Sequence, residues 1–372
     1  MGLCPGAVSR QNGSRNYSIM RATLLLSVGL LVAASASAAS LSVFAGGGTK
    51  VTGLATDCRL ADPFATDFDA QGNTYICEMT NNRILKVDAR GILTVFAGTT
   101  KKGAGGDGGP AVEAQFNGPH HLLVARNGDV YVADTWNWNV RRIDGKSGII
   151  TTFAGTGKRG YSGDGGLAKA ADFSGTYCIA FDAAQENLFV ADLENRRVRA
   201  VELASGKVRL VAGNGEKGVP KDGAIATSAP LVDPRAVAVA ANGDVYILER
   251  GGHALRVVGS DGKIRTVAGS GKGGGVTAAT GALEITLNGP KHLWVDRDQS
   301  VLIADTENHV IRRYLPKENQ VVLVAGTGKR GNEFNPNPLK TALRQPHGVN
   351  VDAKGRLFIS DSMNGRVLRL TP

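Results

Sequence analysis

The chain has 372 residues, of which 42% are hydrophobic and 20% charged, and a formal net charge of +10, so it can bury a sizeable core and is not disordered as a whole. Its 50 glycines are near twice the usual share of about 7%, which favours many tight turns. It has neither a collagen-like period nor a second long apolar run, and this excludes fibrous proteins and polytopic membrane proteins.

The amino-terminal residues resemble a leader. Met20 and Arg21 are followed by an apolar stretch over residues 22–34 and by small residues up to Ala38. This order predicts a secretory signal peptide that is cleaved after Ala38. The alternative is an uncleaved anchor, but the apolar stretch is short for a membrane span. We therefore expect residues 1–38 to be an extension and signal peptide, with Met20 as an alternative start, and the mature protein to be secreted or periplasmic without a transmembrane segment.

Removal of the leader would leave three cysteines, Cys58, Cys77 and Cys178, in a compartment that permits disulfides. Cys58 and Cys77 are close enough in sequence to form a disulfide. The sequence leaves two alternatives, a disulfide between these residues or two free thiols. Cys178 lies in a strand-like run and is expected to be a small buried hydrophobe. No CxxC motif and no Cys/His cluster with zinc-ligand spacing occurs, so the sequence predicts no metal and no cofactor.

Two short motifs recur six times between residue 41 and the carboxyl terminus. One is a β-branched run that ends in an acid, at Glu78, Asp134, Asp192, Glu249, Asp305 and Asp361, with spacings of 56 to 58 residues. The other is Phe/Val-Ala-Gly, which ends at Gly46, Gly98, Gly155, Gly213, Gly269 and Gly326. A fixed period of this length indicates a repeat architecture.

Each period contains four short strand-like runs, for example residues 119–124, 129–134, 140–143 and 149–154. Turn residues such as Asn127-Gly128 separate the runs, so each period predicts a four-stranded antiparallel sheet. Such sheets are apolar on both faces and must stack against neighbours. We therefore predict an all-β fold over residues 39–372, a six-bladed β-propeller of four-stranded blades.

The order of the motifs also predicts how the ring closes. The mature chain opens with an outermost strand at residues 41–46 that has no blade before it, and it ends after the third strand of the last unit. We expect residues 41–46 to pair with residues 367–370, which completes the last blade and removes an exposed sheet edge.

The repeats resemble the NHL family of propellers over residues 41–372. The resemblance rests on Pro-x-x-hydrophobic-x-Val-Asp, Val-Tyr-Val-Ala-Asp-x-x-Asn, Arg-Val-Arg and Val-Ala-Gly-Thr-Gly, and glycine-rich tails such as residues 160–166 resemble those of secreted bacterial members. Members of this family serve as protein-binding, RNA-binding, sensor and enzymatic modules, so the resemblance implies the fold and leaves the function open.

In a propeller, the loops that lead into the innermost strands share a face with the loops after the second strands, and this face is the usual site. The residues expected at the rim of the channel follow the opening proline, or Thr176 in the third blade: Phe64, His120, Tyr177, Arg235, Lys291 and His347. The next residues are Ala65, His121, Cys178, Ala236, His292 and Gly348. Imidazoles that converge here can bind metal or transfer protons, and the alternative is that they only hydrate a water-filled funnel.

The fold is also similar to that of the peptidyl-hydroxyglycine amidating lyases, which implies zinc held by a histidine after proline in three alternate blades. His120 and His347 match in the second and sixth blades, but the fourth blade has Arg235. Arginine cannot act as a ligand and repels a cation, so the implied zinc site is incomplete. We expect no metal ligands and no catalytic residues.

Trp136 and Trp138 stand in a loop that elsewhere carries polar residues. An exposed indole suits a sugar or peptide partner, and we expect Trp136 to be the exposed one, whereas Trp138 can pack between blades. Arg235, Lys291 and the histidines are expected to hold an anionic small molecule or a peptide carboxylate.

The recurrent acids are expected to be structural and to accept backbone N–H bonds from the turn that follows them. The arginines of the third strands are spread around the ring, and this distribution, together with the signal peptide, argues against nucleic acid as a partner.

We therefore expect a secreted or periplasmic, monomeric binding platform for a protein, peptide or glycan. The expected ligand-binding residues are His120, His121, Trp136, Tyr177, Arg235, Lys291, His292 and His347. The alternatives are a lyase or hydrolase that uses the histidine-rich funnel, with Arg235 or Tyr177 assisting, and a structural envelope protein without a small ligand.

Overall fold

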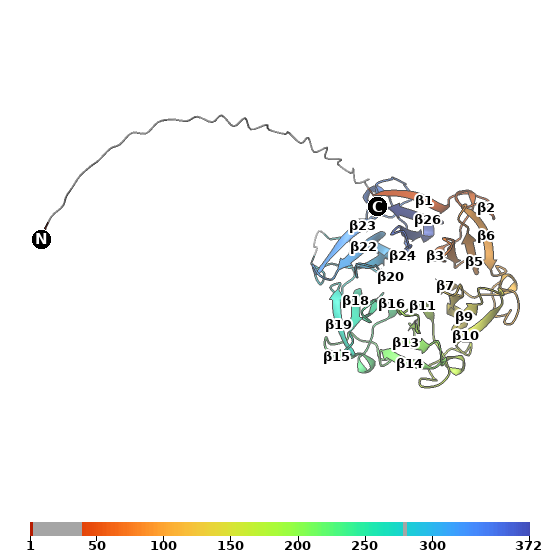
Figure 1. The fold of residues 1–372 in the computed structure, drawn as a ribbon, viewed down its shortest axis with the longest axis horizontal. Coiled ribbons are helices and arrows are strands. Elements are labelled where there is room, and N and C mark those ends of the chain that lie inside the picture. The colour runs from red at the N-terminus through yellow and green to blue at the C-terminus, as the bar shows by residue number, and fades with distance from the viewer. Residues whose placement is uncertain (3–38, 278–280) are drawn as a thin grey trace, which may run out of the picture. The chain divides into compact units, whose positions relative to one another are not determined.

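The computed structural model describes residues 1–2, 39–277 and 281–372. Six antiparallel sheets form a closed ring, so the predicted all-β six-bladed propeller is confirmed (Figure 1). The expected signal peptide lies outside the described residues. In the part of the chain that the structure describes, no helix has the length and apolar character needed to cross a bilayer.

Each blade runs from an innermost to an outermost strand. The first blade has β3 (Pro63–Phe68), β4 (Thr74–Glu78), β5 (Arg83–Val87) and β6 (Ile92–Ala97), with β2 (Gly53–Leu54) outside them. The second has β7 (Pro119–Val124), β8 (Val130–Asp134), β9 (Asn139–Ile143) and β10 (Ile150–Ala154), and the third has β11 (Thr176–Phe181), β12 (Asn187–Asp192), β13 (Arg197–Glu202) and β14 (Val208–Ala212). The four runs predicted for the second blade match these bounds to within one residue.

The remaining blades follow the same order. The fourth has β16 (Pro234–Val239), β17 (Val245–Glu249), β18 (Ala254–Val258) and β19 (Lys263–Ala268), with β15 (Ala224–Ile225) outside them. The fifth has β20 (His292–Val295), β21 (Val301–Asp305), β22 (Val310–Leu315) and β23 (Gln320–Ala325), and the sixth has β24 (Gly348–Val351), β25 (Leu357–Asp361), β26 (Arg366–Thr371) and β1 (Ser40–Gly46).

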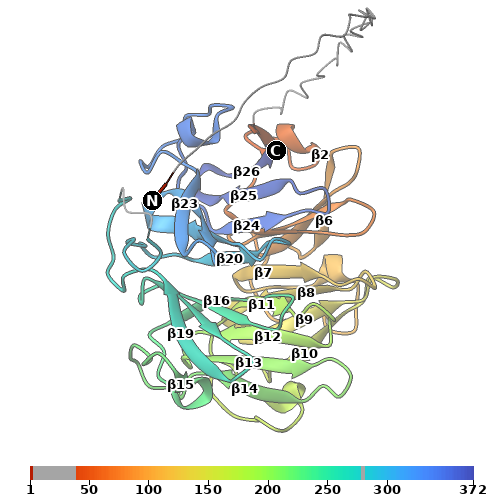
Figure 2. The ribbon, with the colours of Figure 1, turned by 60° about the vertical axis from the view of Figure 1, so that its left-hand side comes forward.

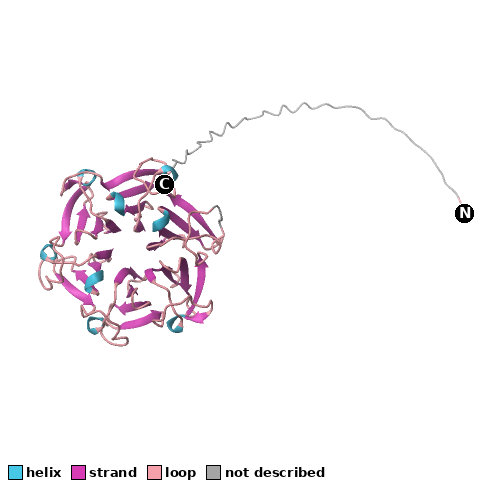
Figure 3. Ribbon diagram, turned by 180° about the vertical axis from the view of Figure 1, so that it is seen from behind, coloured by secondary structure: helices cyan, strands magenta, loops and turns pink. Residues whose placement is uncertain are grey.

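The helical segments among the described residues are single 3-10 turns in the loops (Figure 3). They are η1 (Ala55–Asp57), η2 (Ala111–Glu113), η3 (Thr135–Asn137), η4 (Ala168–Ala170), η5 (Ala226–Ser228), η6 (Thr306–Asn308), η7 (Pro338–Lys340) and η8 (Ser362–Asn364).

The core lies between neighbouring blades because each sheet is apolar on both faces. Every residue of β8 and of β21 is buried. A large apolar side chain three positions before the opening proline of each blade, or before Thr176 in the third, closes the gap between two blades: Leu60, Phe116, Phe173, Leu231, Leu287 and Leu343, all buried. Burial on both faces explains why the strands read as continuous β-branched runs rather than as an alternating pattern.

The acid at the end of each second strand is completely buried. It accepts a backbone N–H in every blade and a side-chain amide in every blade except the fourth, where Gly252 takes the place of the asparagine. Asp134 Oδ1 accepts the Asn117 N–H at 2.7 Å, and Asp305 Oδ1 accepts the Asn288 N–H at 2.7 Å. These N–H groups belong to the loop that leads into the innermost strand, two residues before the proline that opens the blade. The expectation of backbone bonds from the following turn is therefore wrong. That turn contributes a side-chain amide instead, as when Asn308 Nδ2 donates to Asp305 Oδ2 at 2.9 Å.

One arginine of each third strand balances the charge of this acid. The six pairs are Arg83–Glu78, Arg141–Asp134, Arg199–Asp192, Arg256–Glu249, Arg312–Asp305 and Arg366–Asp361. Most of these arginines also donate to loop carbonyls, for example Arg366 Nη2 to Ala342 O at 3.0 Å. The arginines that repeat around the ring are thus internal, which explains their even distribution.

The ring closes as predicted, through β1 and β26. Leu41 faces Leu370 and Ser40 faces Thr371 in an antiparallel register, and β1 becomes the fourth strand of the sixth blade. Figure 2 shows β26, β25 and β24 side by side in this blade. Leu41 and Ala45 are buried by the closure.

The cysteine pairing considered above is wrong in this structure, where Cys58, Cys77 and Cys178 are free and buried. Cys58 packs with Leu60 and Phe358 on one side of the first sheet, whereas Cys77 packs with Phe116 and Leu122 on the other. Their thiols donate to different carbonyls, of Leu54 and Pro119, each at 3.2 Å.

Deletion of residues 41–46 should strongly destabilise the protein. A chain that starts at residue 47 leaves the last blade with three strands and exposes the edge of β26, which promotes association. We expect its thermal midpoint to lie more than about 10 °C below that of a chain that starts at residue 39. Equal midpoints in differential scanning calorimetry would contradict the closure.

Replacement of Asp305 by Ala should also destabilise the protein, because it leaves the Arg312 guanidinium and the Asn288 N–H buried without their acceptor. We expect a loss of about 3–5 kcal/mol in the free energy of unfolding measured with urea. Asp261 pairs with Arg265 at 3.4 Å on the surface, with both side chains about half exposed, and serves as the control. Asp261→Ala should cost less than about 1 kcal/mol; similar losses for the two variants would argue against the structural role of the acid.

Candidate functional site

Two consecutive residues at or just before the start of each innermost strand lie next to the central channel. In the first four blades a β-bulge makes this possible, because the register between the first and second strands shifts at the rim residue, as between Pro119 and His121. Without a bulge, neighbouring residues would point to opposite faces of the sheet. In the last two blades, Lys291 and His347 precede the regular strand and donate backbone bonds to Ala304 and Ser360 at 3.1 Å. The channel is therefore lined by two tiers of side chains.

We call the first tier the rim. It consists of Phe64, His120, Tyr177, Arg235, Lys291 and His347. Phe64 stacks on His347 at a centroid distance of 3.9 Å and contacts His120 edge-on at 5.1 Å. His120 in turn meets Tyr177 at 4.7 Å. These rings form one continuous aromatic cluster, so the histidines do not line an open, hydrated funnel.

The two rim histidines are neutral and have a defined tautomer. The Nδ1 atom of His120 contacts Gly118 O at 2.7 Å, and that of His347 contacts Gln345 O at 2.9 Å. Because a carbonyl only accepts, Nδ1 carries the proton in both rings. Burial, and then the Arg235 charge, hold the pKa of His120 well below its ordinary value. The pKa of His347 is held low by burial, Lys291 and Arg235.

Arg235 is a buried cation without an anionic partner. Its side chain is 5% exposed and its guanidinium lies over the Tyr177 ring at 4.4 Å. Among the described residues, no carboxylate or carbonyl accepts a hydrogen bond from it, and the nearby Asp233 pairs with Arg250 at 3.0 Å. Burial lowers the pKa of Arg235 to about 10, so it remains charged at pH 7. Lys291, by contrast, pairs with Glu307 at 3.1 Å.

Trp136 stands beside the rim as an exposed aromatic platform. Its side chain is 41% exposed and its ring meets His120 edge-on at 5.4 Å. Gly118, in a left-handed conformation with φ +60°, supports it, since a Cβ at that position would collide with the indole. Trp138 is the partly buried cap of η3. The expectation that Trp136 is the exposed indole is confirmed.

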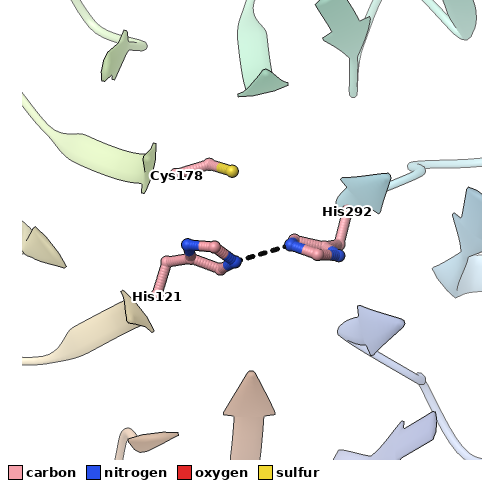
Figure 4. A group of neighbouring side chains, drawn as sticks. All are labelled: His121, Cys178 and His292. Carbon is pink, nitrogen blue, oxygen red and sulfur yellow. Dashed lines mark hydrogen bonds between the residues drawn. The ribbon is translucent and has the colours of Figure 1, made fainter. Parts of the chain in front are cut away.

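We call the second tier the His121 cluster, and it consists of His121, Cys178 and His292 (Figure 4). The Nε2 atoms of His121 and His292 are 2.7 Å apart, and the ligand-type atoms of the three residues all lie within 4.8 Å of one another. The other three positions of this tier are Ala65, Ala236 and Gly348.

Burial dominates the ionisation of the His121 cluster. It lowers the pKa of His292 to about 3, with Arg235 adding to the shift, and holds the pKa of His121 well below its ordinary value. The same burial raises the pKa of the Cys178 thiol to about 11. All three groups are therefore uncharged at pH 7.

A cavity of about 260 Å³ adjoins the His121 cluster on the side away from the rim. Its wall includes His121, His292, Asp67, Asp182 and Trp294. Asp67 is held by the Val124 N–H at 2.7 Å, and burial raises its pKa to about 6. Polar groups thus lie at the far end of the channel as well.

The structure brings most of the residues expected from the sequence together, but in two separate groups. Trp136, His120, Tyr177, Arg235 and His347 form the first group, together with Phe64. The second group joins His121 and His292 with Cys178, which the sequence analysis treated only as a hydrophobe. The alignment of the repeats contains a signal for this grouping, because Cys178 occupies in its blade the position that His121 and His292 occupy in theirs.

Replacement of His120 by Gln should reduce the acid sensitivity of the protein. The unfolded chain binds a proton at His120 below about pH 6.5, but the folded chain does not, so acid favours unfolding. Between pH 7 and pH 5 the parent should lose about 2 kcal/mol more than the variant in the free energy of unfolding. Buried carboxyls such as Asp134, whose pKa is raised by burial to about 6, also contribute to the pH dependence of stability. Their contribution is the same in the parent and in the variant, so it drops out of the difference between the two. Equal losses in urea titrations would show that His120 ionises freely in the folded state.

Several proteins are similar to this chain. The protein SUPPRESSOR OF QUENCHING 1, chloroplastic, of Arabidopsis thaliana is 27% identical over 68% of this chain and 25% of its own length. NHL repeat-containing protein 2 of Gallus gallus is 26% identical over 78% of this chain and 44% of its own length. The chain thus spans less than half the length of these curated relatives.

Solved structures show the same fold at low identity. An auxiliary nutrient binding protein from Bacteroides ovatus superimposes with a TM-score of 0.65 and 16% identity, over 90% of this chain and 76% of its own. Virginiamycin B lyase from Staphylococcus aureus, solved with quinupristin, gives a TM-score of 0.55 and 13% identity, over 90% of this chain and 100% of its own. The family model described as the Teneurin NHL domain matches residues 167–370, more than half of the chain. The chain therefore belongs to the Teneurin NHL domain family.

Proposed function

We propose that the protein is a secreted or periplasmic binding platform that engages a protein, peptide or glycan partner on its rim face. The partner carries a carboxylate, which Arg235 holds, and an apolar or sugar surface, which stacks on Trp136. The observation that carries this proposal is the buried Arg235 guanidinium without an anionic partner.

The energetics of Arg235 support an anionic ligand. A buried charge is costly unless it is paired, and here it is compensated by the Tyr177 ring and, at longer range, by Asp233, which is itself paired with Arg250. A guanidinium offers five donors in a planar fork that suits a carboxylate. The rim histidines are neutral and carry their proton on Nδ1, so their Nε2 atoms can accept a hydrogen bond from a hydroxyl or amide of the partner, and Arg235 supplies the donors for the carboxylate.

Trp136 supports a partner larger than a single anion. Its indole is fixed by Gly118 and His120, so stacking costs little side-chain entropy, and rigid exposed aromatic residues often anchor interfaces. The corresponding turn of the sixth blade presents Met363, which is 39% exposed. A structural neighbour is described as an auxiliary nutrient binding protein, which agrees with a binding role for this fold.

The proposal can be tested with matched ligand pairs. Peptides with a free carboxyl terminus, and uronic acid oligosaccharides, are compared by isothermal titration calorimetry with their amidated or neutral counterparts. We expect only the carboxylate forms to bind. Arg235→Met should weaken binding at least about tenfold, because a hydrogen bond to a charged group contributes about 1.5–3 kcal/mol.

Tyr161 provides the control for Trp136. It is equally exposed, at 41%, but it lies in a long loop where Arg197 stacks on it at 3.7 Å. Trp136→Ala should weaken binding of the carboxylate ligands, and Tyr161→Ala should not. Equal affinity for the two ligand forms, or unchanged affinity in Arg235→Met and Trp136→Ala, would rule out the rim face as the binding surface.

A further inference from the structure

The His121 cluster contains a buried polar atom that the protein leaves without a partner. The Val349 N–H points at His292 Nδ1 at 3.3 Å, so Nδ1 accepts and Nε2 of His292 carries the proton. The Nε2–H group of His292 donates to His121 Nε2, which therefore carries no proton. The single ring proton of neutral His121 is then on Nδ1. That N–H group has no acceptor among the described residues, although the side chain is only 5% exposed.

We propose that His121, Cys178 and His292 bind a single transition-metal ion of the copper and zinc class. The ligand atoms are His121 Nε2, His292 Nε2 and Cys178 Sγ, which come from three different blades and lie within 4.8 Å of one another. Figure 4 shows the three side chains projecting toward one another from β7, β11 and β20. The site is independent of the partner proposed for the rim.

The donor set selects the class of ion. Two imidazoles and one thiolate suit Cu⁺ or Zn²⁺, whereas Ca²⁺ and Mg²⁺ require oxygen ligands. Three protein ligands also leave room for a water or a further ligand on zinc. The ion displaces the thiol proton of Cys178, which is released to solvent, so the burial that keeps this thiol protonated in the free protein is overcome by the metal charge.

The rest of the tier consists of small residues. The three other positions of the tier carry Ala65, Ala236 and Gly348, so no further side chain crosses the channel there. The cavity of about 260 Å³ reaches both histidines from the end away from the rim. Asp67 and Asp182 line this cavity together with one cation, Arg126, so its ionisable wall carries two acids against one base, whereas Arg235 disfavours entry from the rim.

Binding requires two rearrangements. The two Nε2 atoms are 2.7 Å apart, and two nitrogens that each lie about 2.0–2.1 Å from one ion in tetrahedral geometry are farther apart than this, so the imidazoles must separate slightly. His121 already has the tautomer of a ligand, with the Nε2 lone pair free and the proton on Nδ1. His292 must move its proton from Nε2 to Nδ1, which breaks the long bond from the Val349 N–H. The metal therefore replaces the proton between the two Nε2 atoms, and the Val349 amide becomes a reporter of occupancy.

The test uses the full chain, reduced and freed of metal by chelation, with Cu⁺ under anaerobic conditions, Zn²⁺ and Co²⁺ in separate titrations and Ca²⁺ as a control. We expect about one equivalent of Cu⁺ or Zn²⁺ by mass spectrometry of metal content, and none of Ca²⁺. Co²⁺ should give a thiolate-to-metal charge-transfer band. Hydrogen exchange at the Val349 amide should become faster in the metal-bound protein.

Variants assign the ligands. Cys178→Ser and His292→Gln should each lower the affinity at least about 100-fold, since loss of an outer-sphere partner alone costs about 10- to 100-fold. Cys178→Ser should also abolish the charge-transfer band. Cys77→Ser and His347→Gln are matched controls, because Cys77 is an equally buried free thiol and His347 belongs to the rim. Both controls should bind metal like the parent.

Two results would overturn the proposal. One is the absence of stoichiometric Cu⁺, Zn²⁺ and Co²⁺ binding to the parent. The other is binding that persists in Cys178→Ser and His292→Gln, or that falls equally in Cys77→Ser. If Cys178→Ser unfolds, as judged by circular dichroism, His121→Gln replaces it and the same outcomes apply.

Discussion

The buried acid at the end of each second strand is the interaction on which the rest of the structure depends. It joins three parts of a blade that are not neighbours in sequence: the loop before the innermost strand, the turn after the second strand and an arginine of the third strand. In the second blade, Asp134 holds the Asn117 N–H three residues before His120. Its other oxygen binds Asn137 in the turn that presents Trp136. The rim and the exposed indole are therefore positioned by one carboxylate, and a change there would disturb the proposed binding face from within the core.

The repeat structure made most of the fold predictable, because a period of 56 to 58 residues, an additional strand at the start and a missing fourth strand in the last unit define six blades and their closure. The channel tiers were predictable for the same reason, since equivalent positions of a repeat meet at the axis. Which residues contact one another across the axis was not predictable, because these contacts depend on the distances between blades. His121 and His292 are 171 residues apart, and no spacing rule links them or adds Cys178.

The points that the sequence left open or assigned wrongly have equally local causes. Cys58 and Cys77 are near in sequence, but the first sheet separates them, so proximity along the chain did not mean proximity in space. The acids were expected to accept N–H groups of the turn that follows them, because polar side chains often form hydrogen bonds with nearby backbone. The backbone N–H groups that needed an acceptor lie 17 residues earlier instead, as Asn288 does relative to Asp305. The water-filled funnel, one of the two alternatives for the rim, is not formed because Phe64, an apolar member of the ring, packs against both His120 and His347.

The composite sixth blade also determines the order in which the protein can fold. Blades one to five consist of consecutive segments and can form as the chain emerges, each stacking on the one before. The pairing of Leu41 with Leu370 joins residues from opposite ends of the chain, so it must wait until synthesis is nearly complete. Until then β1 has no partner and the first blade has one uncovered face, where Cys58 and Leu60 await Phe358. The last event of folding is therefore the one that removes the remaining apolar surface, and it is also the one most exposed to competition from a second chain.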